Sequence, residues 1–277
     1  MTDLFFPNQP PHVLEQEKRI RRVAADLPEA AQLTIYEALT ALVPSLAETR
    51  FVPEQDMVLA LQCGGELAFP RPIPPVKLCI LAFGYREWLR RKYCLPGFVE
   101  VEGGDLVVDC GAYVGGFALS AAGIAREVHA FEPDSANASC ARRNLAGWPN
   151  VKVVERGLYG TSREMILNVS ANSVEHSLLL PDDGVVVQER RIEVVTLADY
   201  LRSEGIGRLD FLKLEAEGVE LEVFAGLGEV RPRKIAIDVS PERNGQSPAA
   251  EFRARLDPLG YEVRQRGQVM FARAAAD

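Results

Sequence analysis

Short apolar strands alternate with helical segments from Asp105 to the end of the chain, and this alternation restricts the fold more than any other feature. A strand–helix–strand alternation predicts a parallel sheet covered by helices on both faces. A final strand pair over 261–273 predicts an antiparallel hairpin that closes one edge. The predicted fold class is therefore α/β, with a mostly parallel seven-stranded sheet. The segments that predict its parallel strands are 105–111, 127–133, 151–160, 209–218 and 233–240.

The first hundred residues have a different pattern. Apolar residues recur at helical spacing over 12–49, with breaks at Pro28 and Pro44, and two short runs over 57–70 predict a hairpin around Gly64 and Gly65. A further helix is predicted over 78–93. We therefore expect two domains: a mainly helical N-terminal cap or extension over 1–100, and an α/β domain over 101–277.

Composition excludes several classes of protein. The chain has 277 residues, of which 47% are hydrophobic, so it can bury a sizeable core, and its net charge of −8 comes without a basic run. Nucleic acid is not an expected partner, because neutralising phosphates needs clustered Lys and Arg. No apolar stretch predicts a membrane span, and no charged-then-apolar leader opens the chain. Five cysteines without a CxxC pair indicate a reduced, cytoplasmic compartment, with each cysteine a small buried hydrophobe.

The stretch from Leu106 to Gly123, LVVDCGAYVGGFALSAAG, predicts a ligand site. It begins as a buried strand, passes Asp109 and three glycines, and continues as a helix. In an open parallel sheet, ligands bind beyond the carboxyl ends of the strands, where the strand order reverses. Glycines let the backbone turn sharply and approach a ligand closely. The alternative interpretation is a turn that only packs the helix against the strand.

A second acid narrows the choice of ligand. Glu132 ends the next predicted strand, where one carboxylate can accept bonds from both hydroxyls of a ribose. A nucleoside-bearing cofactor is therefore expected. The glycine pattern, G-A-Y-V-G-G, is not the G-x-G-x-x-G of dinucleotide-binding proteins, and Asp109 would repel a pyrophosphate. A carboxylate at this place suits a cation, as in the methionine part of S-adenosylmethionine.

Four motifs together resemble the FkbM family of class I S-adenosylmethionine-dependent methyltransferases, over roughly 85–272. Two of them, DCGAYVGGFAL and VHAFEPD, are typical of class I methyltransferases in general. The other two are NVKVVERGLYG and LDFLKLEAEGVELEVFAGL, and the last contains the more specific K-x-acid-x-E-G-x-E pattern, formed by Lys213, Glu215, Glu217, Gly218 and Glu220. The resemblance implies a Rossmann-like methyltransferase fold and methylation of hydroxyl oxygens in natural products or in glycan and lipid-linked sugars.

The resemblance also implies roles for individual residues. Glu132 would take the ribose hydroxyls, the end of the third strand would line the adenine, and the glycine-rich turn would line the methionine part. Removal of the hydroxyl proton needs a base. Glu215 is the leading candidate and His176 the second, while Lys213 would hold a carboxylate or lower the pKa of the hydroxyl. The predicted cofactor-binding residues are Asp109, Gly111, Ala112, Tyr113, Gly115, Phe131, Glu132, Pro133, Arg156, Gly157 and Leu158.

The chain departs from the family pattern at several positions. Glu215 stands where the family usually has Asp, and Asp238 stands where it often has Glu, so compensating lengths would preserve the separation of the two carboxylates. Tyr113 replaces a frequent Asn, and His176 replaces a small polar residue. His129, inside the second strand, is expected to be a core residue with satisfied hydrogen bonds.

Several alternatives stay open. Glu215, Glu217 and Asp238 could supply oxygen ligands to a divalent metal, although no spacing is diagnostic and a metal is not favoured. A methyltransferase-fold scaffold without activity is the main alternative function, and a nucleotide-dependent oxidoreductase is less favoured. Residues 1–100 would cap the site or mediate assembly into a homo-oligomer. The expected partner is a small-molecule or glycan hydroxyl acceptor.

Overall fold

The central sheet of the computed structural model has seven strands in the order β12-β13-β11-β10-β4-β5-β6. The model describes residues 11–170, 186–243 and 245–275. All neighbours pair in parallel except β13, which is antiparallel to both of its neighbours. This order confirms the predicted Rossmann-like α/β sheet with an antiparallel C-terminal hairpin. The strands are β4 (Leu106–Cys110), β5 (Glu127–Phe131), β6 (Val151–Val154), β10 (Phe211–Leu214), β11 (Lys234–Asp238), β12 (Tyr261–Arg266) and β13 (Val269–Ala274).

Two apolar clusters cover the two faces of this sheet. Val107 belongs to the cluster that contains α6 (Gly116–Ala122) and α7 (Ser135–Leu145), whereas its neighbour Val108 belongs to the cluster that contains α8 (Leu197–Ser203), α9 (Glu220–Ala225) and α10 (Ala249–Leu256). Successive strand residues face opposite sides, so a strand buried on both faces is apolar throughout. A short 3-10 helix, η1 (Asp257–Leu259), follows α10.

A small second sheet lies beside the central one, in the order β7-β9-β8. A hairpin follows residue 160, where β8 (Arg163–Ser170) pairs antiparallel with β9 (Val186–Val195). The single strand predicted over 151–160 is wrong. It divides into β6 and the two-residue β7 (Gly157–Leu158), which pairs with β9 in the other sheet. Between β6 and β7 the chain therefore passes from the central sheet to the small sheet, next to the residues expected to line the adenine.

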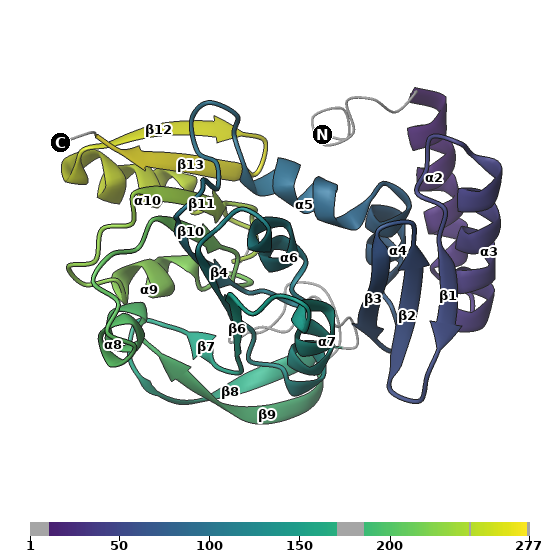
Figure 1. The fold of residues 1–277 in the computed structure, drawn as a ribbon, viewed down its shortest axis with the longest axis horizontal. Helices are drawn as coiled ribbons and strands as arrows, with labels where there is room; N and C mark the ends of the chain where they lie inside the picture. Colours follow the sequence, from purple (N-terminus) through teal and green to yellow (C-terminus); the bar gives the residue numbers. More distant parts are fainter. Residues whose placement is uncertain (1–10, 171–185, 244, 276–277) are drawn as a thin grey trace.

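The N-terminal region contains helices and a three-stranded sheet (Figure 1). The predicted hairpin is confirmed as β2 and β3, and β1 adds a strand that the apolar pattern did not predict. The single helix expected over 78–93 is wrong, because Gly84, at φ 89°, separates α4 from α5. The elements are α2 (Pro11–Ala24), α3 (Glu29–Leu42), β1 (Arg50–Pro53), β2 (Met57–Gln62), β3 (Gly65–Pro70), α4 (Pro75–Ala82) and α5 (Tyr85–Tyr93).

Helix α5 connects the N-terminal region to the α/β region, running from α4 towards the β12–β13 hairpin (Figure 1). It packs directly on α6, because a Cβ at Gly116 would lie 2.3 Å from the ring of Tyr85 and 2.4 Å from Leu89. One apolar cluster joins Phe69 of β3 to Phe211 of β10. The boundary expected near residue 100 is therefore crossed by a continuous core.

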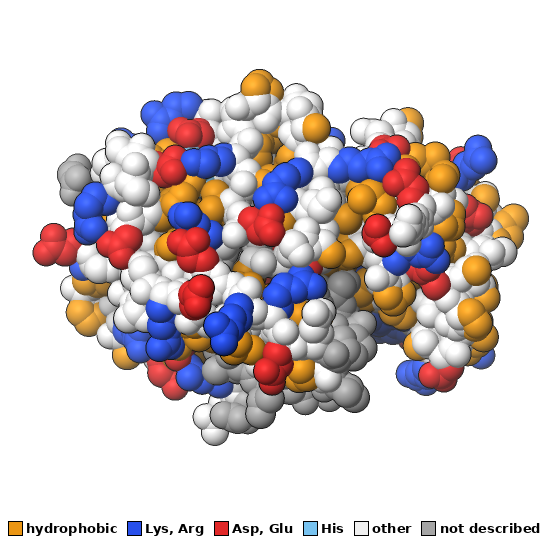
Figure 2. Space-filling view, turned by 90° about the horizontal axis from the view of Figure 1, so that it is seen from below, with side chains coloured by type: hydrophobic (Ala, Val, Ile, Leu, Met, Phe, Trp, Pro, Cys, Tyr) orange, Lys and Arg blue, Asp and Glu red, His pale blue; other side chains and the backbone are white. Residues whose placement is uncertain are grey.

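No helix in the described part of the chain is long and apolar enough to cross a bilayer. Figure 2 shows basic and acidic side chains intermixed on one face, with no extended patch of a single sign.

Four cysteines are buried as expected, but Cys63 is exposed. That residue lies in the tight turn between β2 and β3, where its side chain has no core to enter.

Candidate active site

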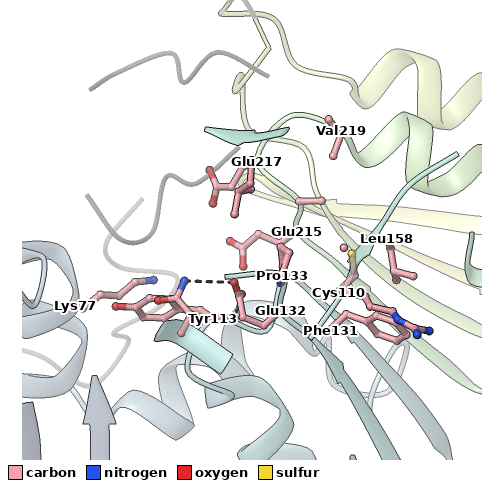
Figure 3. A pocket seen from close by; sticks show the side chains of 16 residues that line it. Lys77, Cys110, Tyr113, Phe131, Glu132, Pro133, Leu158, Glu215, Glu217 and Val219 are labelled. Atoms are coloured by element: carbon pink, nitrogen blue, oxygen red, sulfur yellow. Dashed lines mark hydrogen bonds between the residues drawn. The ribbon is translucent and has the colours of Figure 1, made fainter. Parts of the chain in front are cut away.

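A pocket opens at the carboxyl ends of β4, β5 and β10 (Figure 3). The strand order changes direction at this place, since β5 and β10 flank β4 on opposite sides. The pocket has an empty volume of about 760 Å³, part of it open to solvent, which is a common size for a small-molecule site. It is lined by Lys77, Cys110, Gly111, Tyr113, Phe131, Glu132, Pro133, Asn137, Arg156, Gly157, Leu158, Leu167, Glu215, Ala216, Glu217 and Val219.

The glycine-rich turn brings two strand ends into close contact. Gly111 has φ 70°, and a Cβ there would lie 1.8 Å from the carbonyl oxygen of Glu215. Only glycine fits this approach. Tyr113 has φ 52°, an uncommon conformation for a residue with a side chain. Its ring packs against Phe69 of the N-terminal region, with ring centroids 6.3 Å apart.

Glu132 lies in the pocket wall with its carboxylate held by backbone groups. Its Oε2 accepts from the Tyr113 amide at 2.8 Å, and its Oε1 accepts from the Asp134 amide at 2.9 Å and from Asn137 Nδ2 at 3.4 Å. Burial raises the pKa of Glu132 to about 8, although these donors oppose the rise. A carboxylate oxygen has two acceptor positions. Among the described residues only the Tyr113 amide donates to Oε2, so this oxygen keeps one position for a hydroxyl donor from a ligand.

Asp109 and Lys213 form a buried ion pair outside the pocket lining. Lys213 Nζ lies 3.1 Å from Asp109 Oδ1 and donates to the carbonyl oxygens of Cys110 and Gly111 at 3.0 and 2.7 Å. Asp109 Oδ2 accepts from the Ala118 amide at 3.1 Å in the first turn of α6. The structure thus places Asp109 under the turn, where it neutralises Lys213, instead of in the wall where a cofactor cation was expected.

Lys92, at the end of α5, joins two carboxylates from different strands. Its Nζ lies 2.6 Å from Glu215 Oε1 and 2.8 Å from Asp238 Oδ2, and Glu215 Oε2 lies 3.2 Å from Lys213 Nζ. Burial alone would raise the pKa of Glu215, but the ammonium groups of Lys92, Lys213 and Lys77 lower this pKa well below its usual range. The two carboxylates whose lengths depart from the family pattern thus share one lysine.

A second group of carboxylates lies in the loop after β10. Glu217 lines the pocket with φ 50°, a conformation that costs free energy and is concentrated at functional sites. Burial raises the pKa of Glu217 well above its usual range, and the charges of Glu242 and Glu215 raise it further. Glu220 Oε1 accepts from the amides of Ala216 and Gly218 at 2.7 and 3.2 Å, which fixes the loop that carries Glu217.

Most predicted cofactor residues surround this pocket. Asp109, Ala112, Gly115 and Lys213 support it from outside its lining, and Gly115 contacts α7 at Leu145. His176 lies outside the described residues. His129 is a buried residue with both ring nitrogens bonded, to Tyr200 at 2.7 Å and Glu127 at 2.9 Å, as expected. The predicted residues in the lining are Gly111, Tyr113, Phe131, Glu132, Pro133, Arg156, Gly157, Leu158 and Glu215.

Two lysines of the site come from helices before residue 101, and sequence reasoning missed both. Lys77 is in α4 and Lys92 in α5, far along the chain from the motifs. Lys92 stands in the helical segment 86–93, whose several basic residues by themselves indicate a solvated helix face. Its amphipathic spacing was the available signal, because Lys92 follows the buried Leu89 at an interval of three residues.

Among the residues that the structure describes, no three His, Cys, Asp or Glu side chains are grouped as a metal site. Glu215 and Asp238, two of the candidate oxygen ligands, are bridged by Lys92 in this structure.

The fold and the pocket define a Rossmann-like α/β protein with a ligand site at the strand ends, and the chain belongs to the FkbM methyltransferase family. The model of the methyltransferase FkbM domain matches residues 109–263. The chain is 27% identical over 227 residues to the 31-O-demethyl-FK506 methyltransferase FkbM of Streptomyces tacrolimicus, covering 69% of this chain and 85% of the relative. It is 26% identical over 193 residues to the methyltransferase sdnD of Sordaria araneosa, covering 57% and 73%.

A solved structure is also similar. The crystal structure of a methyltransferase FkbM from Methylobacillus flagellatus KT has 18% sequence identity and a TM-score of 0.46. The similarity covers 72% of this chain and 53% of that chain, so this chain spans about half of its length.

Proposed function

We propose that this protein is an S-adenosylmethionine-dependent O-methyltransferase that acts on a hydroxyl group of a small natural product or of a sugar or glycan. The observation that supports it most is the placement of Glu132, which lies in the pocket wall with an acceptor position left on Oε2. A ribose hydroxyl is a donor that fits this position. The relative from Streptomyces tacrolimicus, an O-demethyl-FK506 methyltransferase by name, supports oxygen in a natural product as the acceptor atom.

The pocket fits the parts of this cofactor. Phe131, Leu158 and Leu167 offer apolar surface for an adenine, and Glu132 follows directly along the β5 end. Bound S-adenosylmethionine supplies an electrophilic methyl group on a sulfonium. In this proposal Asp109 does not touch the cofactor, since it holds Lys213 and the start of α6.

Glu217 is the proposed base. Glu215 was the leading candidate from sequence, but a carboxylate held by Lys92 and Lys213 is a weak base because protonation would break both ion pairs. Glu217 lines the same pocket, and burial raises its pKa whereas the ammonium groups lower that of Glu215, so Glu217 accepts a proton more readily than Glu215 does. Glu217 would take the hydroxyl proton as the oxygen attacks, and Glu215 would position Lys92.

Transfer of a labelled methyl group tests the proposal. The protein is incubated with S-adenosylmethionine carrying a ¹³C methyl group and with pooled hydroxylated natural products and nucleotide sugars. A ¹³C methoxy signal in a product supports the proposal. A label found on nitrogen or carbon would contradict O-methylation, and loss of activity in Glu217→Gln by about 10²- to 10⁴-fold is expected for the base. Wild-type activity in that variant would contradict the role of Glu217.

A non-catalytic scaffold and an oxidoreductase predict other results. A scaffold transfers no methyl group to any acceptor. An oxidoreductase binds NAD, which the glycine pattern of this turn disfavours.

A further inference from the structure

Lys77 of α4 reaches the active-site pocket from outside the matched family domain. It lines the pocket, and its Nζ lies 5.0 Å from the centre of the Tyr113 ring. Figure 3 shows its side chain extending from the N-terminal region towards Tyr113 and Glu132. The family match begins at residue 109. Lys77 is therefore a contribution of the N-terminal region to the pocket.

The three lysines near Glu215 differ in their partners. Lys92 Nζ has two carboxylates within 2.8 Å, and Lys213 Nζ has two within 3.2 Å. Across the described residues, Lys77 Nζ has neither an ion pair nor a hydrogen bond, and a ring face is its nearest partner. A half-buried ammonium gains free energy from a carboxylate that a ligand brings. Among the three lysines that the structure describes around Glu215, Lys77 is thus the one available to an anionic group of a ligand.

The position of Lys77 shows which anionic group would reach it. In the close-up of the pocket, Leu158 and Phe131 lie at one end, Glu132 lies between, and Lys77 lies beyond Tyr113 at the other end (Figure 3). A nucleoside held between Leu158 and Glu132 leaves the amino-acid part of the cofactor on the side of Tyr113. That part ends in a carboxylate.

We propose that Lys77 binds the carboxylate of the methionine part of the cofactor, so that the N-terminal region completes the cofactor site. This inference rests on the proposed function. It gives Tyr113 a role as well, because its ring lies under the ammonium and restricts where the Lys77 side chain can go.

Burial and the surrounding charges shift the pKa of the Lys77 ammonium. Burial lowers the pKa of Lys77 to about 8, with Lys92 and Lys213 lowering it and Glu215 and Glu217 raising it. Lys77 therefore carries its charge below about pH 8 and loses it above. A bound carboxylate would favour the charged form.

Calorimetric titration with two cofactor fragments tests the inference. S-Adenosylhomocysteine carries the carboxylate, and 5′-methylthioadenosine has the nucleoside without it; neither titration contains an acceptor. In Lys77→Met, the affinity for S-adenosylhomocysteine should fall by about 10- to 100-fold, while the affinity for methylthioadenosine should not change. Lys77→Arg, which keeps the charge, should retain most of the affinity at pH 7 and weaken less than the wild type above pH 8.

Three other binding results would contradict either the role of Lys77 or the proposed function. Equal affinity of Lys77→Met and wild type for S-adenosylhomocysteine would overturn the inference and leave the cofactor proposal intact. Equal weakening of both fragments would also overturn it, because Lys77 would then support the pocket in general. A wild type that binds neither fragment would overturn the proposed function itself. Lys152→Met, on the surface beside Glu204, is the matched control and should bind both fragments as the wild type does.

Discussion

At Gly111 the site has no space for a side chain. Its φ of 70° and a Cβ position 1.8 Å from the Glu215 carbonyl oxygen leave no room for a side chain. Gly111→Ala should lower the free energy of unfolding by about 3 kcal/mol or more, because the β4 and β10 ends must separate. Urea unfolding measures this loss. Gly103→Ala, with no atom within 4 Å of its Cβ, should change stability by less than about 0.5 kcal/mol; an equal loss in the two variants would refute the argument.

We predict that Glu215 and Asp238, which both bind Lys92, are matched in side-chain length. The family pattern places a shorter acid at the first position and often a longer one at the second, and Lys92 reaches both carboxylates within 2.8 Å. Glu215→Asp and Asp238→Glu should each lower the free energy of unfolding by about 1–3 kcal/mol, since each disturbs the geometry of a half-buried ion pair. The double variant should recover most of this loss. Unfolding free energies of the four proteins form the test, and additive losses would show that the two carboxylates are not coupled.

At the scale of elements, α5 matters because it carries Lys92. Arg266 of β12 donates to the carbonyl oxygens of Arg91, Lys92 and Cys94, with the last two bonds at 3.2 Å. These bonds satisfy carbonyl groups that the end of a helix leaves without intrahelical donors. Arg266 is thus a positioning residue for Lys92.

Removing this cap should loosen α5 locally. Arg266→Met is expected to raise amide hydrogen exchange at the C-terminal end of α5 by about tenfold or more, because buried carbonyl groups lose their donors. Arg264→Met, on the same hairpin with an exposed side chain, is the control and should leave that exchange unchanged. If α5 is equally protected in both variants, the cap does not position Lys92.

Sequence patterns predicted the elements of the α/β region well, because strand burial and helix capping leave local signals. Asp134, an acid directly before the helical segment, caps α7, with its side chain accepting from the amides of Ala136 and Asn137. The break at Gly84 and the two-residue β7 were not predicted, because tertiary pairing decides them. Lys77 and Lys92 were not predicted either, since their pairing with the strand ends depends on how the N-terminal helices pack.

At the scale of the whole molecule, the shared core makes the N-terminal region part of one folding unit. Phe69 is fully buried, packs edge-on against Tyr85 at 5.2 Å and belongs to the cluster that reaches Phe211. The full chain should therefore unfold in a single calorimetric transition. Phe69→Ala should lower the free energy of unfolding by about 3–5 kcal/mol and move that whole transition to lower temperature.

A separate early transition in Phe69→Ala would contradict a shared core, because only the N-terminal region would then have lost stability. Leu42→Ala serves as the control in the same region. Leu42 is 80% exposed, so the free energy of unfolding of this variant should match that of the wild type within about 0.5 kcal/mol.

The central claim is that the pocket at the ends of β4, β5 and β10 binds S-adenosylmethionine, and calorimetric titration of the full chain tests it most directly. The wild type should bind S-adenosylmethionine and not NAD, and Glu132→Ala should weaken the binding by about 10- to 100-fold, because the ribose hydroxyls lose their acceptor. Binding of NAD alone, or no binding of S-adenosylmethionine by folded protein free of cofactor, would contradict the account.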